Sequence, residues 1–157
     1  MDRRTVLLFP FLALAACGAP APTGPPAALK APPPGKAQVY IIRPRTMVGA
    51  GNLLITRVNG AVVSQLQVGQ YTIVPVDPGE TVLTMRNRIQ GPLPLLVLRA
   101  MQEVAGFQEI GRVNLAAGQT AFMDYHWVRW TDADEASRLL GAGPTYVPPV
   151  NLAGPPV

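Results

Sequence analysis

Short apolar runs separated by turn residues fill the middle of the chain. Residues 37–43, AQVYIIR, are rich in β-branched and aromatic side chains and stop at Pro44, which cannot continue a central strand. The next two apolar runs flank Asn59-Gly60, the pair that best accepts the two positive φ angles of a type I′ turn. The pattern therefore predicts one strand followed by a β-hairpin.

Two further pairs of apolar runs are joined by turn signals. Residues 77–79, Asp-Pro-Gly, separate the runs 70–76 and 80–88, and Ala-Ala-Gly at 116–118 precedes an aromatic run at 119–130. We predict a second and a third hairpin from these turns. The expected fold class is all-β: a single seven-stranded antiparallel β-sandwich, immunoglobulin-like or transthyretin-like, with one or two short helices.

The run at 119–130 alternates between two faces if it forms one strand. Alternation assigns to the predicted core face Ala121, Met123, Tyr125 and Trp127, and to the other face Phe122, Asp124, His126 and Val128. After this strand, Thr131 or Asp132 can cap a short helix that runs to Leu140 and stops at Gly141.

Residues 93–107, LPLLVLRAMQEVAGF, combine a helical apolar period with extra apolar positions. Leu95 and Leu98 lie outside the stripe, so a helix seated on the sandwich would expose them, and exposed apolar surface indicates an interface. We predict Leu95, Leu98 and Met101 as partner-contact residues. An element buried in the core, helix or strand, remains an equal alternative because the apolar run also fits a strand.

The N-terminal residues have the form of an export signal. Arg3 and Arg4 precede an apolar run at 6–16 that is too short to span about 30 Å of hydrocarbon as a helix. The residues LAAC at 14–17 then form a lipobox, in which a signal peptidase cuts before a cysteine that carries a diacylglyceryl group. We predict a lipoprotein signal peptide at 1–16 and attachment to membrane lipid through acylated Cys17.

Two details address the route and the membrane. The polar lead-in before the apolar run is very short, which favours the general export route over the twin-arginine route. Gly18 stands where an aspartate usually signals inner-membrane retention in Gram-negative lipoproteins. The predicted location is therefore the cell envelope, at the outer membrane facing the periplasm.

Pro, Ala and Gly dominate both ends of the chain that follows the signal. Residues 17–36 predict a tether in extended polyproline geometry, on the order of 50 Å long at about 3.1 Å per residue. Residues 142–157 predict a Pro-rich disordered tail. The sandwich is expected between them at 37–141, with an apolar insert near 89–109.

Composition limits the classes of function. The chain has 13 Lys and Arg and 9 Asp and Glu; the signal holds two of the former and one of the latter, which leaves a net charge of +3. The basic residues are scattered along the sequence, so nucleic-acid binding is not expected. The single cysteine is assigned to lipid, so stability must come from the core rather than from a disulfide.

Asp124 and His126 are the best candidates for chemistry, since side chains two apart on a strand share a face. A metal site needs three or four ligands, and a nucleophilic site needs Ser, Thr or Cys beside a base. The chain has one histidine, and its serines have unremarkable neighbours. We therefore expect no enzyme activity, cofactor or metal. Of Trp127 and Trp130, one is expected inside the core and the other at a rim.

Four short motifs follow one another along the predicted sandwich. They are Val39-Tyr40-Ile41-Ile42-Arg43-Pro44, Asn59-Gly60, Pro78-Gly79 and Ala117-Gly118-Gln119. In this order they resemble the bacterial lipoprotein domain of unknown function numbered 2846, over about residues 37–141. The resemblance brings no catalytic residues, and the apolar segment between 88 and 109 departs from the family's pattern.

Two classes of function follow from these patterns. The first is a tethered, non-catalytic interaction or structural module of the envelope with a protein partner. The second is an apolar-ligand carrier or small enzyme that uses the segment 89–109 as a lid. A large enclosed apolar cavity with convergent polar groups would favour the second class.

Overall fold

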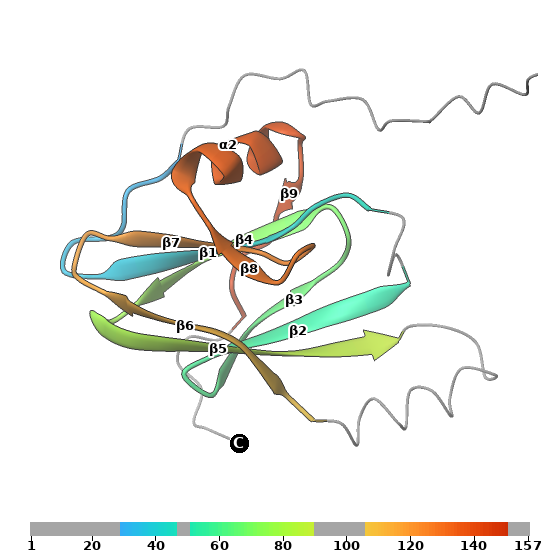
Figure 1. The fold of residues 1–157 in the computed structure, drawn as a ribbon, viewed down its shortest axis with the longest axis horizontal. Helices are drawn as coiled ribbons and strands as arrows, with labels where there is room; N and C mark the ends of the chain where they lie inside the picture. Colours follow the sequence, from blue (N-terminus) through green and yellow to red (C-terminus); the bar gives the residue numbers. More distant parts are fainter. Residues whose placement is uncertain (1–28, 47–50, 90–105, 151–157) are drawn as a thin grey trace, which may run out of the picture.

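A computed structural model describes residues 29–46, 51–89 and 106–150, which form two packed β-sheets and one helix (Figure 1). The elements in chain order are β1 (Ala37–Arg43), β2 (Asn52–Val58), β3 (Ala61–Leu66), β4 (Gln70–Val76), β5 (Gly79–Ile89), β6 (Gln108–Leu115), β7 (Thr120–Asp124), β8 (Arg129–Thr131), α2 (Ala133–Gly141) and β9 (Thr145–Tyr146). One sheet has the order β8-β7-β1-β4-β9 and the other β3-β2-β5-β6. The predicted all-β sandwich is confirmed.

The strand pairing differs from the prediction in number and direction. The described residues form nine strands rather than seven, and β1 pairs in parallel with β7, as β4 does with β9. Parallel pairs join strands that are distant in the chain, so no short turn sequence between the strands predicts them. The sandwich is therefore mainly, not wholly, antiparallel.

Only one of the three predicted hairpins forms as expected. Asn59 and Gly60 adopt φ angles of 49° and 84° between β2 and β3, which pair with each other. The turn at 77–79 instead leads from β4 in one sheet to β5 in the other, and the turn at 116–118 leads from β6 to β7 in the same way. The hairpins predicted at 77–79 and 116–118 are therefore wrong. A tight turn reverses the chain, but it does not decide which sheet the next strand joins.

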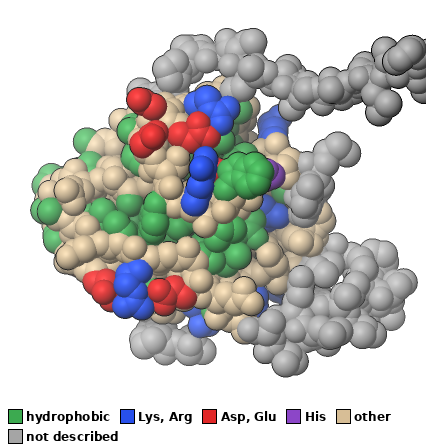
Figure 2. Space-filling view, in the orientation of Figure 1, with side chains coloured by type: hydrophobic (Ala, Val, Ile, Leu, Met, Phe, Trp, Pro, Cys, Tyr) green, Lys and Arg blue, Asp and Glu red, His purple; other side chains and the backbone are tan. Residues whose placement is uncertain are grey.

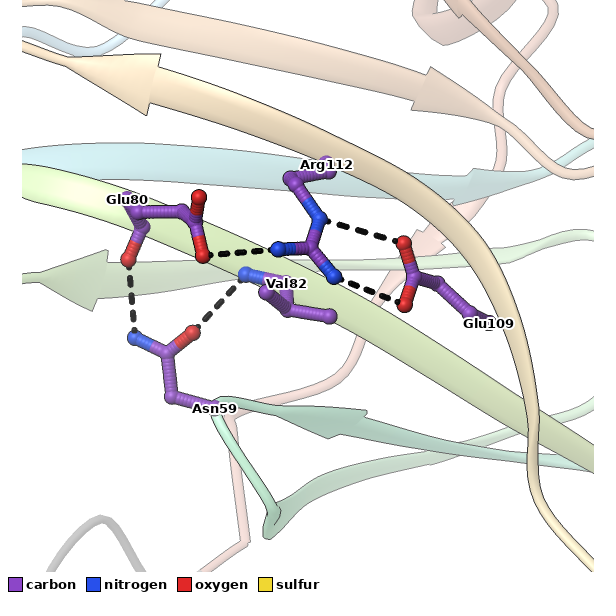
Figure 3. A network of polar contacts seen from close by, with 5 residues as sticks. All are labelled: Asn59, Glu80, Val82, Glu109 and Arg112. Carbon is purple, nitrogen blue, oxygen red and sulfur yellow. Dashed lines mark hydrogen bonds and ion pairs between the residues drawn. The ribbon is translucent and has the colours of Figure 1, made fainter.

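The β2–β3 turn is attached to the neighbouring strand β5 (Figure 3). Asn59 Oδ1 accepts the backbone N–H of Val82 at 2.8 Å, and the backbone N–H of Asn59 donates to the carbonyl of Val82 at 2.9 Å. Beside them Arg112 donates to Glu80 at 3.0 Å and to Glu109 at 3.1 Å, and the hydrogen bonds that Glu109 accepts raise the pKa of Arg112. These ion pairs are exposed, so they contribute little to stability.

Strand β1 is the centre of the fold, and all seven of its residues are buried. One face packs in the inter-sheet core, which includes Val39, Ile41, Leu54, Leu83 and Met123. The other face packs in a helix-side cluster made of Tyr40, Ile42, Phe122, Ala136 and Leu140. Helix α2 covers this outer face of the sheet in Figure 1, which is why a strand of a two-layer sandwich is apolar on both sides.

Helix α2 forms where the sequence predicts a closing helix. Of the two predicted caps, Asp132 is the one used: its side chain accepts the backbone N–H of Glu135 at 2.8 Å. Glu135 also holds Arg138, whose hydrogen bond lowers the pKa of the Glu135 carboxyl. The helix then buries Ala136 and Leu140 against the sheet.

The run at 119–130 is not one strand. β7 ends at Asp124, residues 125–128 form a turn, and β8 returns antiparallel to β7. The predicted core face is correct for Ala121 and Met123 and wrong for Trp127, because the period-two alternation stops where the chain turns. Trp130, on β8, is partly buried and packs against the inter-sheet core beside Gly111, so it is the tryptophan that contacts the core.

Segments on both sides of residues 37–141 contact the sandwich. The backbone N–H of Lys30, in the predicted tether, donates to Tyr40 Oη at 2.8 Å. In the predicted tail, β9 pairs with β4, and the backbone N–H of Val150 donates to the carbonyl of Val63 at 2.8 Å. Proline-rich composition excludes these segments from a core, but it does not prevent them from packing on one.

Candidate functional site

The structure brings together only some of the residues that the sequence suggests for a site. Cys17, the predicted lipidation site, and Leu95, Leu98 and Met101, the predicted partner contacts, lie outside the described residues. The segment 89–109 therefore stays untested as a lid or a contact element. Asp124 and His126 are described, at the end of β7 and in the turn that follows it.

Asp124 supports the backbone of this turn rather than the imidazole. Its side chain is 1% exposed, and its Oδ1 accepts the backbone N–H of His126 at 2.9 Å. This contact between a carboxylate and the amide two residues on is the pattern that stabilises a turn locally. The His126 ring instead packs against Trp127, so the contacts of these two side chains do not join the carboxylate to the imidazole.

We call residues 125–128 the Trp127 turn. Trp127 is 66% exposed. The rings of His126 and Trp127 pack edge to face, with 4.5 Å between their centroids. In Figure 2 a protruding hydrophobic side chain lies beside the histidine on this part of the surface. Val128 has a φ of 50°, which costs a β-branched residue on the order of 1–3 kcal/mol. The turn holds a strained backbone and exposes its largest apolar side chain.

A cavity of about 340 Å³ opens next to the Trp127 turn, at the end of the sandwich. Strand ends and loops from both sheets contribute its lining, which consists of Arg43, Pro44, Thr46, Asn52, Val68, Met85, Asn87, Tyr125, His126 and Val128. Four of these side chains are aliphatic, thioether or proline, and the others are polar or aromatic. The cavity is thus an open cleft of mixed character.

Arg43 is the charged group in this cleft, and it is only 4% exposed. Its Nη1 donates to the backbone carbonyls of Asn52 at 2.9 Å and Leu66 at 2.6 Å, which lie on β2 and β3 of the opposite sheet. The guanidinium also lies 5.4 Å from the centre of the Tyr125 ring. Burial lowers the pKa of Arg43, while Tyr125 acts in the opposite direction. The arginine links the two sheets and places a positive charge at the wall of the cleft.

Tyr125 and Asn87 complete the polar wall. Tyr125 Oη donates to Asn87 Oδ1 at 2.7 Å. With its oxygen occupied, Asn87 has its NH₂ group left as a donor. Tyr125 was predicted for the core face; it is only partly buried, packs against the core and reaches the cleft.

A second, shallower cavity of about 500 Å³ continues from the first and shares Thr46 and Val68 with it. Arg45 lines it, with its side chain placed over Gly69, where a Cβ atom would lie 2.7 Å from Arg45 Cγ. Gly69 also has a φ of 77°, so both space and backbone favour glycine. We call the two cavities together the arginine groove.

The arginine groove combines arginine side chains, polar side chains and an apolar side. Its described lining includes threonine hydroxyls but no serine or cysteine, and the imidazole of His126 meets Trp127 edge to face. Within the described part of the chain, no three His, Cys, Asp or Glu side chains are grouped to hold a metal ion. The sequence reasoning missed Arg43, Asn87 and Arg45; the one available signal was an arginine at the end of an otherwise apolar strand, next to Pro44.

Comparison with models of protein families, with curated proteins and with solved structures gives no match to this chain. Among the helices of the described residues, none has the length and apolar character needed to cross a membrane.

Proposed function

We propose that this protein is a lipid-anchored lipoprotein of the cell envelope whose sandwich is a non-catalytic interaction module, with the Trp127 turn as its contact surface. The observation that carries the proposal is the 66% exposure of Trp127 on a turn with a supported, strained backbone. Tryptophan is among the residues most enriched where binding energy concentrates, and a fixed turn loses little entropy on binding.

The anchor and the address of the proposal rest on sequence. The lipobox that ends at Cys17 supports attachment to lipid, and Gly18 supports an outer-membrane location facing the periplasm. The motifs from Val39 to Gln119 support kinship with the lipoprotein domain of unknown function 2846. The alternative of an apolar-ligand carrier has less support, since the described cleft is open and partly polar.

Replacing Cys17 by serine is expected to move the protein from the detergent phase to the aqueous phase on phase partitioning. A single acyl chain binds membranes only marginally, so stable attachment requires the several chains of a lipidated cysteine. Gly18→Ala is the matched control, because it leaves the thiol in place and should stay in the detergent phase. Equal partitioning of wild type and Cys17→Ser would contradict the anchor.

Replacing Trp127 by alanine is expected to remove the protein's cross-links to its envelope partner while the thermal unfolding midpoint changes little. An exposed side chain contributes little to the core, whereas truncating a binding hot spot typically costs about 2 kcal/mol or more of affinity. Cross-linking in intact cells, followed by mass spectrometry, measures the cross-links to the partner.

The matched control is Val150→Ala, which truncates another exposed apolar side chain that lies beside β3. Val150→Ala should retain the cross-links. If Trp127→Ala retains them as well, the Trp127 turn is not the contact surface.

A further inference from the structure

We infer that the arginine groove receives the C-terminal carboxylate of a partner polypeptide, with the partner's last apolar side chain packed beside the Trp127 turn. This inference rests on the proposed function, because it specifies the chemistry of the partner that the same surface binds. Four properties of the groove support it: its positive charge, its hydrogen-bond donors, the burial of Arg43 and the size of its first cavity.

The groove is positively charged along its length. Arg43 lines its first cavity and Arg45 its second, and the described residues that line the two cavities include no Asp or Glu. Asp124 directly precedes the lining residue Tyr125 in the chain. It shares a face of β7 with Phe122 on the helix side, and its carboxylate accepts the backbone N–H of His126. The charges of the described lining therefore favour an anion over a cation.

The groove also offers donors suited to a carboxylate. Asn87 lines the first cavity and keeps its NH₂ group as a donor while its oxygen accepts from Tyr125, and Asn52 lines the same cavity. Guanidinium and amide N–H groups hold carboxylates through short, charge-assisted hydrogen bonds. An uncharged amide in place of the carboxylate would lose this charge and would bring N–H groups toward donors.

The positive charge at the wall is buried, which strengthens its effect on a ligand. Arg43 is 4% exposed, and its position is fixed by two backbone carbonyls and the Tyr125 ring. A charge held in a region of low dielectric attracts an opposite charge more strongly than one in water. Burial lowers the pKa of Arg43, but an arginine remains cationic at neutral pH.

The size of the first cavity favours the end of a peptide over a lipid. The first cavity, of about 340 Å³, is near the small end of ligand sites, and Pro44, Val68, Met85 and Val128 give it an apolar side. One terminal residue with an apolar side chain fills such a space. The open mouth beside Trp127 lets the preceding residues leave along the surface, whereas a long acyl chain would need an enclosed tunnel.

The test uses the full processed chain and compares the binding of two peptides. One is N-acetyl-Gly-Ser-Leu-Phe with a free carboxylate, and the other is the same peptide as its C-terminal amide. Binding is followed through the backbone ¹H–¹⁵N signals of residues 125–129 and the side-chain amide of Asn87. The carboxylate peptide is expected to bind roughly ten times more tightly than the amide, the gain of one charge-assisted interaction. Equal affinity for the two peptides would overturn the inference.

Asn87→Asp is the most specific variant, because the new carboxylate still accepts from Tyr125 but replaces the donor with a negative charge. It is expected to abolish the preference for the carboxylate peptide. Arg45→Met, at an exposed position, should reduce the preference severalfold without unfolding, while Arg112→Met, on the outer face of the other sheet, should leave it unchanged. A preference unaffected by both Asn87→Asp and Arg45→Met would overturn the inference.

Phosphatidylglycerol vesicles provide the lipid arm of the test. Vesicle binding that requires Asn87 and Arg45, without a preference for the carboxylate peptide, would overturn the peptide assignment. The proposed function fails separately: Trp127→Ala would then retain the envelope cross-links, whatever the two peptides do.

Discussion

Replacing Tyr40 by alanine is expected to lower the free energy of unfolding by about 3–5 kcal/mol, the usual cost of removing a large buried aromatic side chain. Tyr40 is fully buried at the centre of the helix-side cluster. Its ring lies 5.2 Å from that of Phe122 and 6.5 Å from that of Tyr71, measured between centroids. The loss would open a void beneath α2 and would remove the acceptor for the backbone N–H of Lys30. Chemical denaturation monitored by circular dichroism measures the change.

Tyr40→Phe separates the contribution of the ring from that of the hydroxyl group. It keeps the ring and removes only the hydroxyl, so it is expected to cost about 1 kcal/mol. Burial raises the pKa of Tyr40, which agrees with a phenol kept neutral inside the cluster. If Tyr40→Ala were as stable as Tyr40→Phe, the outer layer of α2 and residues 29–36 would not be part of the cooperative unit.

Replacing Arg43 by methionine is expected to lower the free energy of unfolding by about 2–3 kcal/mol, although methionine preserves most of the apolar stem. The guanidinium hydrogen-bonds the ends of β2 and β3 from β1 in the other sheet. Without it, the carbonyls of Asn52 and Leu66 lose a charged donor in a part of the molecule with little access to water. The same denaturation measurement tests this expectation.

Arg112→Met is the matched control, since Arg112 makes two exposed ion pairs within a single sheet. Its unfolding midpoint should stay close to that of the wild type. Equal midpoints for the Arg43 and Arg112 variants would show that the link between the two sheets is not a stabilising contact. Because Arg43→Met weakens the fold, Asn87 and Arg45 are the better probes of ligand binding.

Much of the secondary structure is predictable from short stretches of sequence. The runs of β-branched and aromatic residues at 37–43 and 70–76 give β1 and β4, and Asn59-Gly60 gives the β2–β3 hairpin. Asp132 with Glu135 three residues later marks the start of α2. These features depend on φ preferences and on side chains within a few residues of one another, so the local sequence is sufficient to specify them.

The site depends on contacts between distant residues, and this is why sequence reasoning missed it. The residues 119–130 look like one alternating strand, yet the buried Asp124 accepts the His126 amide and the chain turns there. That turn moves Trp127 from the predicted core to the surface and brings Tyr125 to Asn87, 38 positions earlier in the chain. No period within the strand carries this information.

The sequence alone determined the class of the fold, the position of most strands and the closing helix, and the lipid anchor at Cys17 stays a prediction from sequence. The tertiary structure alone decided which sheet each strand joins, that β1 runs parallel to β7, and that Arg43 bridges the sheets beside a cleft. The physical reason is the range of the forces involved. Turn geometry and periodicity act between neighbours, whereas sheet pairing and the burial of a charge are settled by side chains that meet only after the chain has folded.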